Sequence, residues 1–246
     1  MNVQTVLGTT LHQSPPAAGS VLTIDKRPLD KQAADLLRQR IVTGAFAPGF
    51  RLVESQLSEQ MNLSRGTIRS ALNNLAHEGL VTQTAYTKWE VTEFSAGDAW
   101  ELFTMRSALE GLAARLAAER IGAAEGERLW NAFEQLETAS GLSDWGRLTD
   151  ADFRLHRTII EIAQHGRLAQ QYRLLEQQVR MVIGSSNSLV PTTSEVVAQH
   201  RPLVEAIAAG RPARAERLAR AHNLDEGKIL VAYVERKSAS ATVALV

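Results

Sequence analysis

Four side chains in the second half of the sequence have the types and spacing of a metal site. Asp152 and His156 are four residues apart, which places both on one face of a helix. His200 and His222 follow, each within a stripe of apolar residues spaced three or four apart. Burying three imidazoles and a carboxylate without partners is costly, and a divalent ion would satisfy all four. Nitrogen and oxygen ligands without sulfur suit zinc, nickel, manganese or iron.

Two other interpretations of this set compete with a bound ion. A single buried histidine is more often a hydrogen-bonded core residue than a ligand, but four ligand-type residues on three inward-facing stripes favour a shared ion. Three histidines and a carboxylate also build catalytic centres, so a metal-dependent enzyme is the alternative. The sequence offers no convincing general base beside the set and no separate nucleophile motif. We therefore expect a protein that is not an enzyme.

A second chemical pattern lies at residues 57–72. It predicts a short helix, a tight turn and a second helix that Ser64 caps. Arg65, Thr67 and Arg69 begin the polar side of this second helix, and such side chains donate to phosphates and base edges. The opposite side has the spacing of a buried face, with Ile68, Ala71, Leu72, Leu75 and Ala76. A helix-turn-helix with an arginine-rich second helix predicts binding to double-stranded DNA.

Two cations flank this motif, Arg51 before it and Lys88 after it. Both are candidates for contacts to DNA phosphates, although ordinary surface charge explains them equally well. Ser64 is a candidate DNA contact as well, but its role as helix cap is sufficient to explain its presence.

The composition is that of an ordinary globular protein, with 246 residues, 44% apolar and 22% charged. The sequence contains no apolar run approaching the roughly 20 residues of a membrane span and no signal-peptide layout. It has no cysteine, which fits a reducing cytoplasm. The formal net charge is zero, and residues 26–94 hold nine basic and seven acidic residues. The prediction of DNA binding therefore depends on the pattern and gains little from composition.

The elements that would position the DNA-reading residues form one domain, residues 25–94. A flexible tail at 1–24 precedes it, rich in Thr, Ser, Pro, Ala and Gly. A helix is expected from Asp30 to about Gly44, and a short extended segment at 51–53. After the helix-turn-helix, Gly79 ends the second helix. Two β-rich runs at 80–84 and 89–92 then predict a hairpin, which would be the wing of a winged helix.

The rest of the chain predicts a helical domain at 95–237, followed by a short tail at 238–246. The first helix should run from Ser95 to about Arg120, and later helices fit 123–138, 143–164, 167–185, 194–209 and 212–236. In the first helix one apolar stripe should face the core, formed by Leu102, Met105, Leu109, Leu112 and Leu116. The predicted fold class is mainly α, a winged helix-turn-helix followed by an antiparallel bundle of about six helices.

With these elements in place, the chain resembles the GntR family of bacterial transcription regulators, in the FadR-like branch with an all-helical (FCD-type) ligand-binding domain. The resemblance covers roughly residues 30–236. It is carried by the segments 47–52, 57–72 and 101–110. The sequence departs from the branch at Gly66-Thr67, where Thr-Pro is more usual. It departs again at Trp89, near the expected wing tip, where Gly is usual.

The resemblance implies a ligand-responsive regulator that binds a palindromic operator as a homodimer. It also implies that Asp152, His156, His200 and His222 hold a divalent ion, and that a small carboxylate-containing effector completes the coordination. The first long helix would face the effector, so that Arg106 could hold its anionic group. A helix-surface ion pair between Arg106 and Glu110 is the alternative. A purely architectural DNA-binding protein would leave the Asp/His set unexplained.

Overall fold

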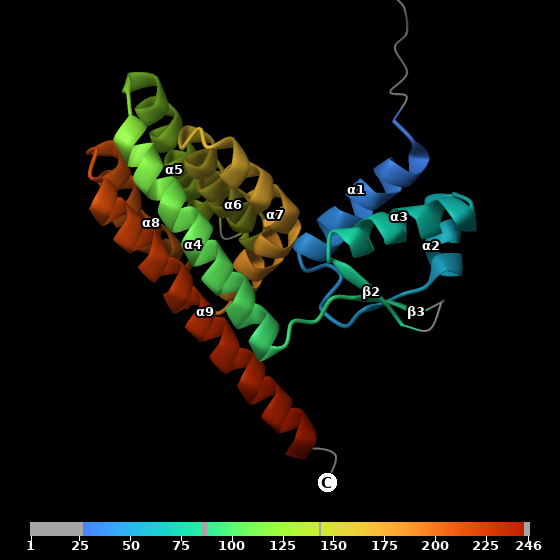
Figure 1. The fold of residues 1–246 in the computed structure, drawn as a ribbon. Coiled ribbons are helices and arrows are strands. Elements are labelled where there is room, and N and C mark those ends of the chain that lie inside the picture. The colour runs from blue at the N-terminus through green and yellow to red at the C-terminus, as the bar shows by residue number, and fades with distance from the viewer. Residues whose placement is uncertain (1–26, 85–87, 143, 244–246) are drawn as a thin grey trace, which may run out of the picture.

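The computed structural model describes residues 27–84, 88–142 and 144–243 of the chain. The predicted tail at 1–24 lies outside the described residues. Figure 1 shows two lobes, a small N-terminal domain and a larger helical bundle, joined by an extended segment that leads into the first helix of the bundle. No helix in the described ranges combines the length and the apolar character needed to cross a membrane.

The N-terminal domain is a winged helix-turn-helix, as predicted. Its elements are α1 (Leu29–Val42), β1 (Arg51–Leu52), α2 (Glu54–Met61), α3 (Arg65–His77), β2 (Val81–Thr84) and β3 (Lys88–Val91). The three strands form an antiparallel sheet in the order β1-β3-β2. The hairpin of β2 and β3 is the predicted wing, and the residues at its tip, 85–87, lie outside the described ranges.

The start of α3 follows from local chemistry. Asn62 ends α2 in the left-handed conformation, with φ of 51°, which asparagine tolerates better than most residues. The Ser64 hydroxyl then accepts a hydrogen bond from the Thr67 backbone N–H at 3.1 Å. This cap satisfies one of the free N–H groups at the helix start. The predicted apolar face is confirmed, since Ile68, Ala71, Leu72 and Leu75 are fully buried.

Trp89 was expected near the tip of the wing, but its side chain lies in the interior of the domain. It pairs with Gln83 in the sheet and its side chain is fully buried. Its indole Nε1 donates to the Glu54 carboxylate at 3.0 Å. A buried tryptophan needs an acceptor for its N–H, and α2 supplies one. Trp89 is therefore part of the domain core.

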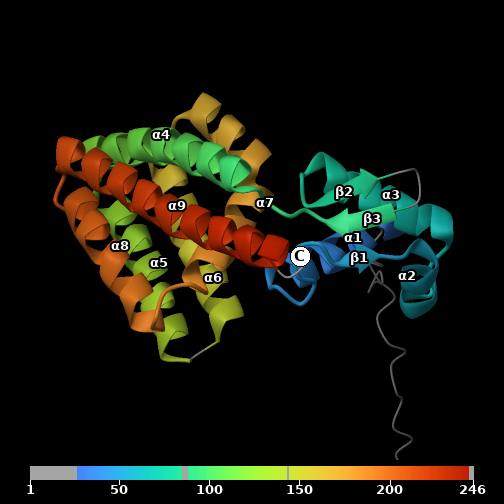
Figure 2. The same cartoon turned by 90° about the horizontal axis from the view of Figure 1, so that it is seen from below.

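The C-terminal domain contains six helices within the described residues (Figure 2). They are α4 (Ala96–Arg120), α5 (Ala123–Gly141), α6 (Trp145–Ile162), α7 (Gly166–Asn187), α8 (Thr193–Ala208) and α9 (Pro212–Val243). α4 and α9 lie side by side for most of their length. Glycine permits this approach, because a Cβ at Gly227 would lie 2.8 Å from the Phe103 Cβ.

Two sequence-based expectations for the helical domain were wrong. The stripe predicted to face the core from α4 lies partly outward, with Met105 49% and Leu112 38% exposed. The face that packs inward instead carries alanines together with Arg106 and Glu110, because these two charges are paired inside the bundle. The last helix continues to Val243, so 238–243 is helical where the sequence predicted a tail. No glycine or proline interrupts it there.

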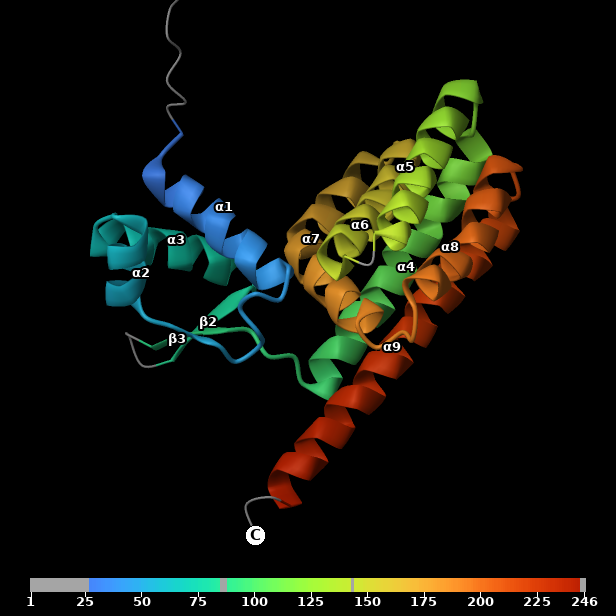
Figure 3. The ribbon, with the colours of Figure 1, turned by 180° about the vertical axis from the view of Figure 1, so that it is seen from behind.

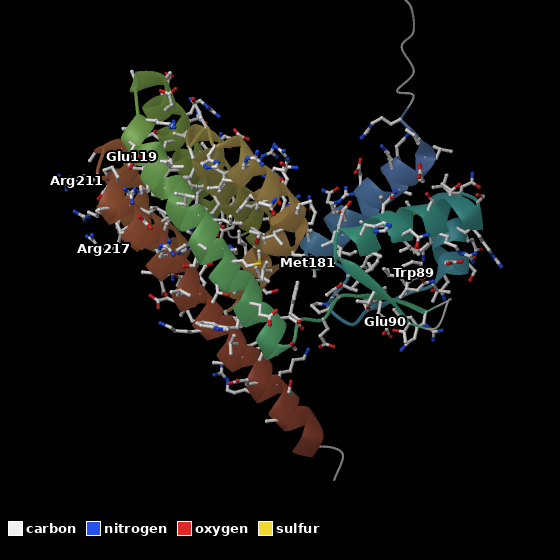
Figure 4. All side chains as sticks on the ribbon, viewed as in Figure 1. Trp89, Glu90, Glu119, Met181, Arg211 and Arg217 are labelled. Carbon is white, nitrogen blue, oxygen red and sulfur yellow. The ribbon has the colours of Figure 1, made fainter. Side chains whose placement is uncertain are left out.

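The two domains share part of one core through α7. Met181 on α7 belongs to the apolar cluster of the winged helix-turn-helix domain, and it lies on the side of the bundle that faces this domain (Figure 4). Gln178, one turn earlier, donates to the Glu78 carbonyl at 3.4 Å. Figure 3 shows the end of α1 beside α7. Helix α7 of the bundle therefore contacts the winged helix-turn-helix domain directly.

Candidate functional site

The predicted metal ligands converge in the centre of the helical domain. The Nε2 atoms of His156 and His200 are 3.1 Å apart. The Asp152 Oδ1 atom lies 3.0 Å from the His200 Nε2 and 3.3 Å from the His156 Nε2. One ring nitrogen from each of the three histidines, His222 included, lies within 4.8 Å of the others. The four side chains come from α6, α8 and α9 and are all buried or nearly so.

Helix geometry explains why these residues meet. Asp152 and His156 are one turn apart on α6, whose start is capped by the Asp144 carboxylate accepting from two backbone N–H groups. His200 lies on the buried face of α8 between Val196 and Leu203. The short connections make α8 and α9 neighbours, which brings His222 to the same point.

The outer atoms of this set are held by fixed partners. The Nδ1 of His156 lies 2.8 Å from a Glu110 carboxylate oxygen, and the Nδ1 of His200 lies 2.7 Å from the Val196 carbonyl. Both acceptors favour the tautomer with hydrogen on Nδ1, which leaves the Nε2 lone pair directed at the centre. Asn187 on α7 donates to the other oxygen of Asp152 at 2.8 Å. Such outer hydrogen bonds orient ligands in metal sites.

The electrostatics of the set favour a cation at its centre. Burial raises the pKa of the Asp152 carboxyl, but the adjacent His200 and His156 rings outweigh this effect and hold it well below its usual range. Burial lowers the pKa of His156, yet Glu110 and Asp152 raise it to about 10. The negative field that favours a proton on this ring also favours a metal ion. Burial and the two other rings lower the pKa of His222, whose neutral form is a ligand.

Two buried atoms show that the residues present fit a metal ion. Among the described residues, the Asp152 Oδ1 and the His222 Nε2 have no hydrogen-bond partner, although unsatisfied buried polar atoms are costly. Nitrogens that share a tetrahedral zinc ion at about 2.1 Å lie about 3.4 Å apart. The separations among Asp152, His156 and His200 are 3.0–3.3 Å and require only small shifts. The ligand nitrogens of all three histidines lie within 4.8 Å of one another, so His222 would have to move closer. Three imidazoles and one carboxylate therefore make an N₃O donor set.

Arg106 lies beside this set and is completely buried. Its Nε donates to Glu110 at 3.0 Å, and its Nη1 donates to Glu226 at 3.3 Å. The predicted pair between Arg106 and Glu110 exists, but inside the bundle and not on the helix surface. The Arg106 Nη2 lacks a hydrogen-bond partner within the described part of the chain. The guanidinium thus keeps one donor free, in the same interior as the histidines.

The structure adds several residues that the sequence argument missed. Glu226 lies one turn after His222, with its Oε1 3.5 Å from the His222 Nε2, and burial raises its pKa. Three further polar groups surround the Arg106–Glu110 pair or Asp152, namely Tyr172, Asn187 and Asn223. The spacing of four between His222 and Glu226 was the available signal. The other three residues carry no recognisable pattern in the sequence.

The residues proposed to contact DNA lie at the start of α3 and on the strands β1 and β3. Arg65 is its first residue and is exposed, and the Ser64 hydroxyl lies 2.8 Å from that of Thr67. Arg51 is exposed on β1. Lys88 begins β3 and pairs with Glu90 at 2.8 Å, which leaves the side chain 46% exposed. All these residues therefore lie at the surface or close to it.

Arg69 differs from Arg65 because it has a fixed partner. Its guanidinium donates twice to Glu54, at 3.0 and 2.8 Å, and hydrogen bonds from Arg69 lower the pKa of this carboxyl. Trp89 donates to the same carboxylate. A bidentate pair orients the guanidinium plane, and the Arg69 side chain stays 56% exposed. The arrangement holds one arginine in a defined direction on the outer face of α3.

Comparisons with known proteins agree with this architecture. The model described as "Bacterial regulatory proteins, gntR family" matches residues 29–85, and the FCD domain model matches residues 101–225. The chain is 28% identical over 185 residues to a Paenarthrobacter nicotinovorans protein named "Probable D-xylose utilization operon transcriptional repressor", covering 75% of this chain and 81% of that one. It is 25% identical over 216 residues to the transcriptional regulator LutR of Bacillus subtilis, covering 79% and 98%.

A solved structure supports the fold. The crystal structure of a chain described as a GntR transcriptional regulator from Rhodococcus sp. RHA1 has a TM-score of 0.70 at 24% identity, with 82% of this chain and 97% of that chain covered. The matched families and relatives are transcription regulators and not enzymes. The FCD model alone spans half of the sequence. The chain therefore belongs to the GntR family of bacterial regulatory proteins, with an N-terminal DNA-binding domain and a C-terminal FCD domain.

Proposed function

We propose that this protein is a cytoplasmic regulator whose homodimer binds a palindromic operator, and that a divalent ion in the helical domain takes part in binding a small carboxylate effector. The observation that carries the proposal is the convergence of Asp152, His156, His200 and His222 around two unsatisfied buried atoms. Zinc, nickel, manganese and iron all accept this donor set. The ion would supply positive charge and an open coordination position to the effector.

Charge balance supports a divalent cation. The interior holds three carboxylates, Asp152, Glu110 and Glu226, against one guanidinium, Arg106. When these four groups are ionised and the histidines are neutral, as metal ligands must be, two negative charges remain uncompensated in a region without solvent. Isolated buried charges are strongly unfavourable. A doubly charged ion bound to the histidines would neutralise the cluster.

Arg106 supports an anionic effector at the same place. It is buried with one free donor, Nη2, and points into the interior that holds the ligand set. Arginine suits carboxylates because its donors match their two oxygens. We therefore assign Arg106 to the effector and the Asp/His set to the ion.

α7 is the element that would carry the effector signal to the DNA-binding domain. Asn187 near its end donates to Asp152, and Met181 lies in the core of the DNA-binding domain. A shift of Asp152 upon effector binding would thus act on a helix that both domains share. Two recognition helices in a dimer fit their half-sites at only one spacing, so a change in domain placement would alter operator affinity.

The outward stripe of α4 is the surface we assign to the dimer. Met105 and Leu112 are exposed, and Leu109 and Leu116 are half-buried, so one side of the helix presents apolar area to solvent. Large exposed apolar patches mark association sites. Leu112→Glu should convert the dimer to a monomer in sedimentation of the full chain at micromolar concentration. A matched change at Ile229, an exposed residue of α9, should leave the dimer intact. A wild-type protein that sediments only as a monomer would contradict the homodimer.

One experiment tests the proposed function as a whole. Metal content is measured on purified wild type and on His200→Ala, and both are then titrated with a selected operator in the presence of organic acids. We expect about one ion per chain in wild type, and operator release by one class of carboxylate. His200→Ala should lose the ion and the response while it keeps basal operator affinity, because α3 lies in the other domain. Equal responses of both proteins would overturn the proposal.

A further inference from the structure

Glu226 is a buried charged residue. Its position is explained neither by the proposed metal site nor by DNA binding. Its two carboxylate oxygens face two different groups, with Oε2 3.3 Å from the Arg106 Nη1 and Oε1 3.5 Å from the His222 Nε2. The residue is only 5% exposed. Its carboxylate therefore lies between the guanidinium assigned to the effector and a ligand assigned to the ion.

This position is the one that an effector carboxylate would need. An anion that binds both Arg106 and an ion held by His222 must place its oxygens between them. Two atoms border that space and lack hydrogen-bond partners among the described residues, the Arg106 Nη2 and the His222 Nε2. The contacts to Glu226, at 3.3 and 3.5 Å, are longer than the 2.7–2.9 Å of strong charge-assisted hydrogen bonds. Glu226 thus occupies this space without making strong hydrogen bonds to the groups that border it.

Charge balance disfavours simultaneous occupancy by two ionised carboxylates. With a divalent ion bound, the carboxylates of Asp152, Glu110 and Glu226 balance the ion and Arg106. A fourth carboxylate, from the effector, would leave one buried negative charge without a partner, which is strongly unfavourable. An ionised effector carboxylate is therefore expected to compete with the ionised Glu226 for this position.

We propose that Glu226 is a tethered carboxylate that occupies the effector position between Arg106 and the metal centre, and that an effector binds by replacing it. The inference rests on the proposed function, because it assumes an ion at the Asp/His set. It defines the effector as a monocarboxylate or a molecule that presents one carboxylate to this point. It also means that Glu226 sets the effector concentration to which the protein responds, because a tethered competitor lowers the apparent affinity for a free ligand.

Through the end of α9, replacement of Glu226 would be coupled to the segment between the two domains. Glu226 lies on the helix that continues to Lys237, which pairs with Glu93 at 3.2 Å in the segment between the domains. A cavity lined by residues from both domains, including Phe94, Leu230 and Tyr233, lies along the same stretch. Movement of Glu226 out of the site would therefore act on a helix that contacts the interdomain segment.

Chemical rescue tests the inference directly. Glu226→Ala removes a group of the size and charge of acetate, so acetate itself is the probe. Full-length, metal-loaded proteins are heated in sodium acetate, with sodium chloride at equal ionic strength and acetamide as a neutral analogue. We expect acetate, and not acetamide, to raise the Tm of Glu226→Ala saturably. Half-saturation in wild type should need at least about tenfold more acetate.

Two further variants make the result decisive. Glu226→Gln keeps the shape and removes the charge, so its acetate midpoint should lie between those of wild type and Glu226→Ala, and it serves if the alanine variant does not fold. Glu216→Ala, on the same helix but in surface ion pairs with Arg115 and Arg220, should behave as wild type. Equal acetate midpoints in wild type and both Glu226 variants would overturn the inference.

Metal content measured on the same samples distinguishes failure of the role of Glu226 from failure of the proposed function. One ion per chain without acetate rescue would overturn the role of Glu226 and leave the proposed function standing. The absence of an ion from wild type after incubation with each candidate metal would overturn both.

Discussion

The two domains place their polar chemistry in opposite positions. Every buried polar or charged side chain among the described residues lies in the helical domain, and the buried core of the winged helix-turn-helix domain is apolar. The polar groups of the latter, such as Arg65 and Arg69, are exposed on α3. A large external ligand such as DNA is met by surface groups. A small ligand can be enclosed within a domain. Its binding groups are then buried as well, and buried charges are stable only when they are paired.

The largest expected effect concerns the buried side of this comparison. Replacing His156, His200 and His222 together by alanine should reduce the metal content from about one ion per chain to background, because three of the four ligands are removed. Elemental analysis of the purified protein measures this. His77→Ala is the matched control, since His77 is exposed at the end of α3 and should retain the ion. A stoichiometric ion in the triple variant would place the metal elsewhere.

Acid should remove the same ion from wild type. Imidazole ligands must be deprotonated, and protons compete with the metal as the pH falls through about 6. Metal retention after dialysis at a series of pH values measures the midpoint. Retention that is unchanged down to pH of about 4 would exclude histidine ligands.

The next largest effect concerns the helix that both domains share. Met181→Ala should lower the free energy of unfolding by about 2 kcal/mol or more, because it opens a cavity in the apolar cluster of the DNA-binding domain. Denaturant titration of the full chain measures the loss. Leu174→Ala provides the control, since Leu174 is 67% exposed on the same helix and should change stability little. Similar losses in both variants would argue against α7 as part of that core.

A smaller effect is expected at the DNA surface. Arg65→Ala and Arg69→Ala should each weaken binding to a selected operator by about tenfold or more, since each removes donors to bases or phosphates. The fold should be unaffected, because neither side chain is buried. Fluorescence anisotropy with labelled operator measures the affinity, and Arg115→Ala on α4 controls for lost surface charge. Wild-type affinity in both α3 variants would show that α3 does not read the operator.

The smallest effect belongs to the cap of α3. Ser64→Ala removes the acceptor for the Thr67 N–H and should lower stability by about 1 kcal/mol. Thermal unfolding measures it. Ser55→Ala, at an exposed position of α2, should have less effect. If Ser64→Ala weakens operator binding far more than it lowers stability, the hydroxyl contacts DNA as well as the helix.

Local patterns in the sequence were sufficient for the DNA-binding domain. Ser64, the apolar spacing of Ile68, Leu72 and Leu75, and the β-rich runs of the hairpin act over a few residues, and the structure has the predicted elements. Trp89 was the exception, because its burial depends on Glu54, which lies 35 residues away. A spacing of four also placed Asp152 and His156 on one face of α6, and inward stripes brought His200 and His222 to the same interior.

Tertiary structure alone decided the charged interior. The apolar spacing of α4 indicated Met105 and Leu112 as core residues, and the structure turns Arg106 and Glu110 inward instead. Hydrophobic periodicity could not show this, because the cost of burying Arg106 is offset by Glu110, one turn away, and by Glu226, 120 residues later. The sequence by itself determined most of the helices and strands, and the types and helix faces of the Asp/His side chains. Which charges share one buried volume depends on pairing between distant helices, and only the packed bundle determines that pairing.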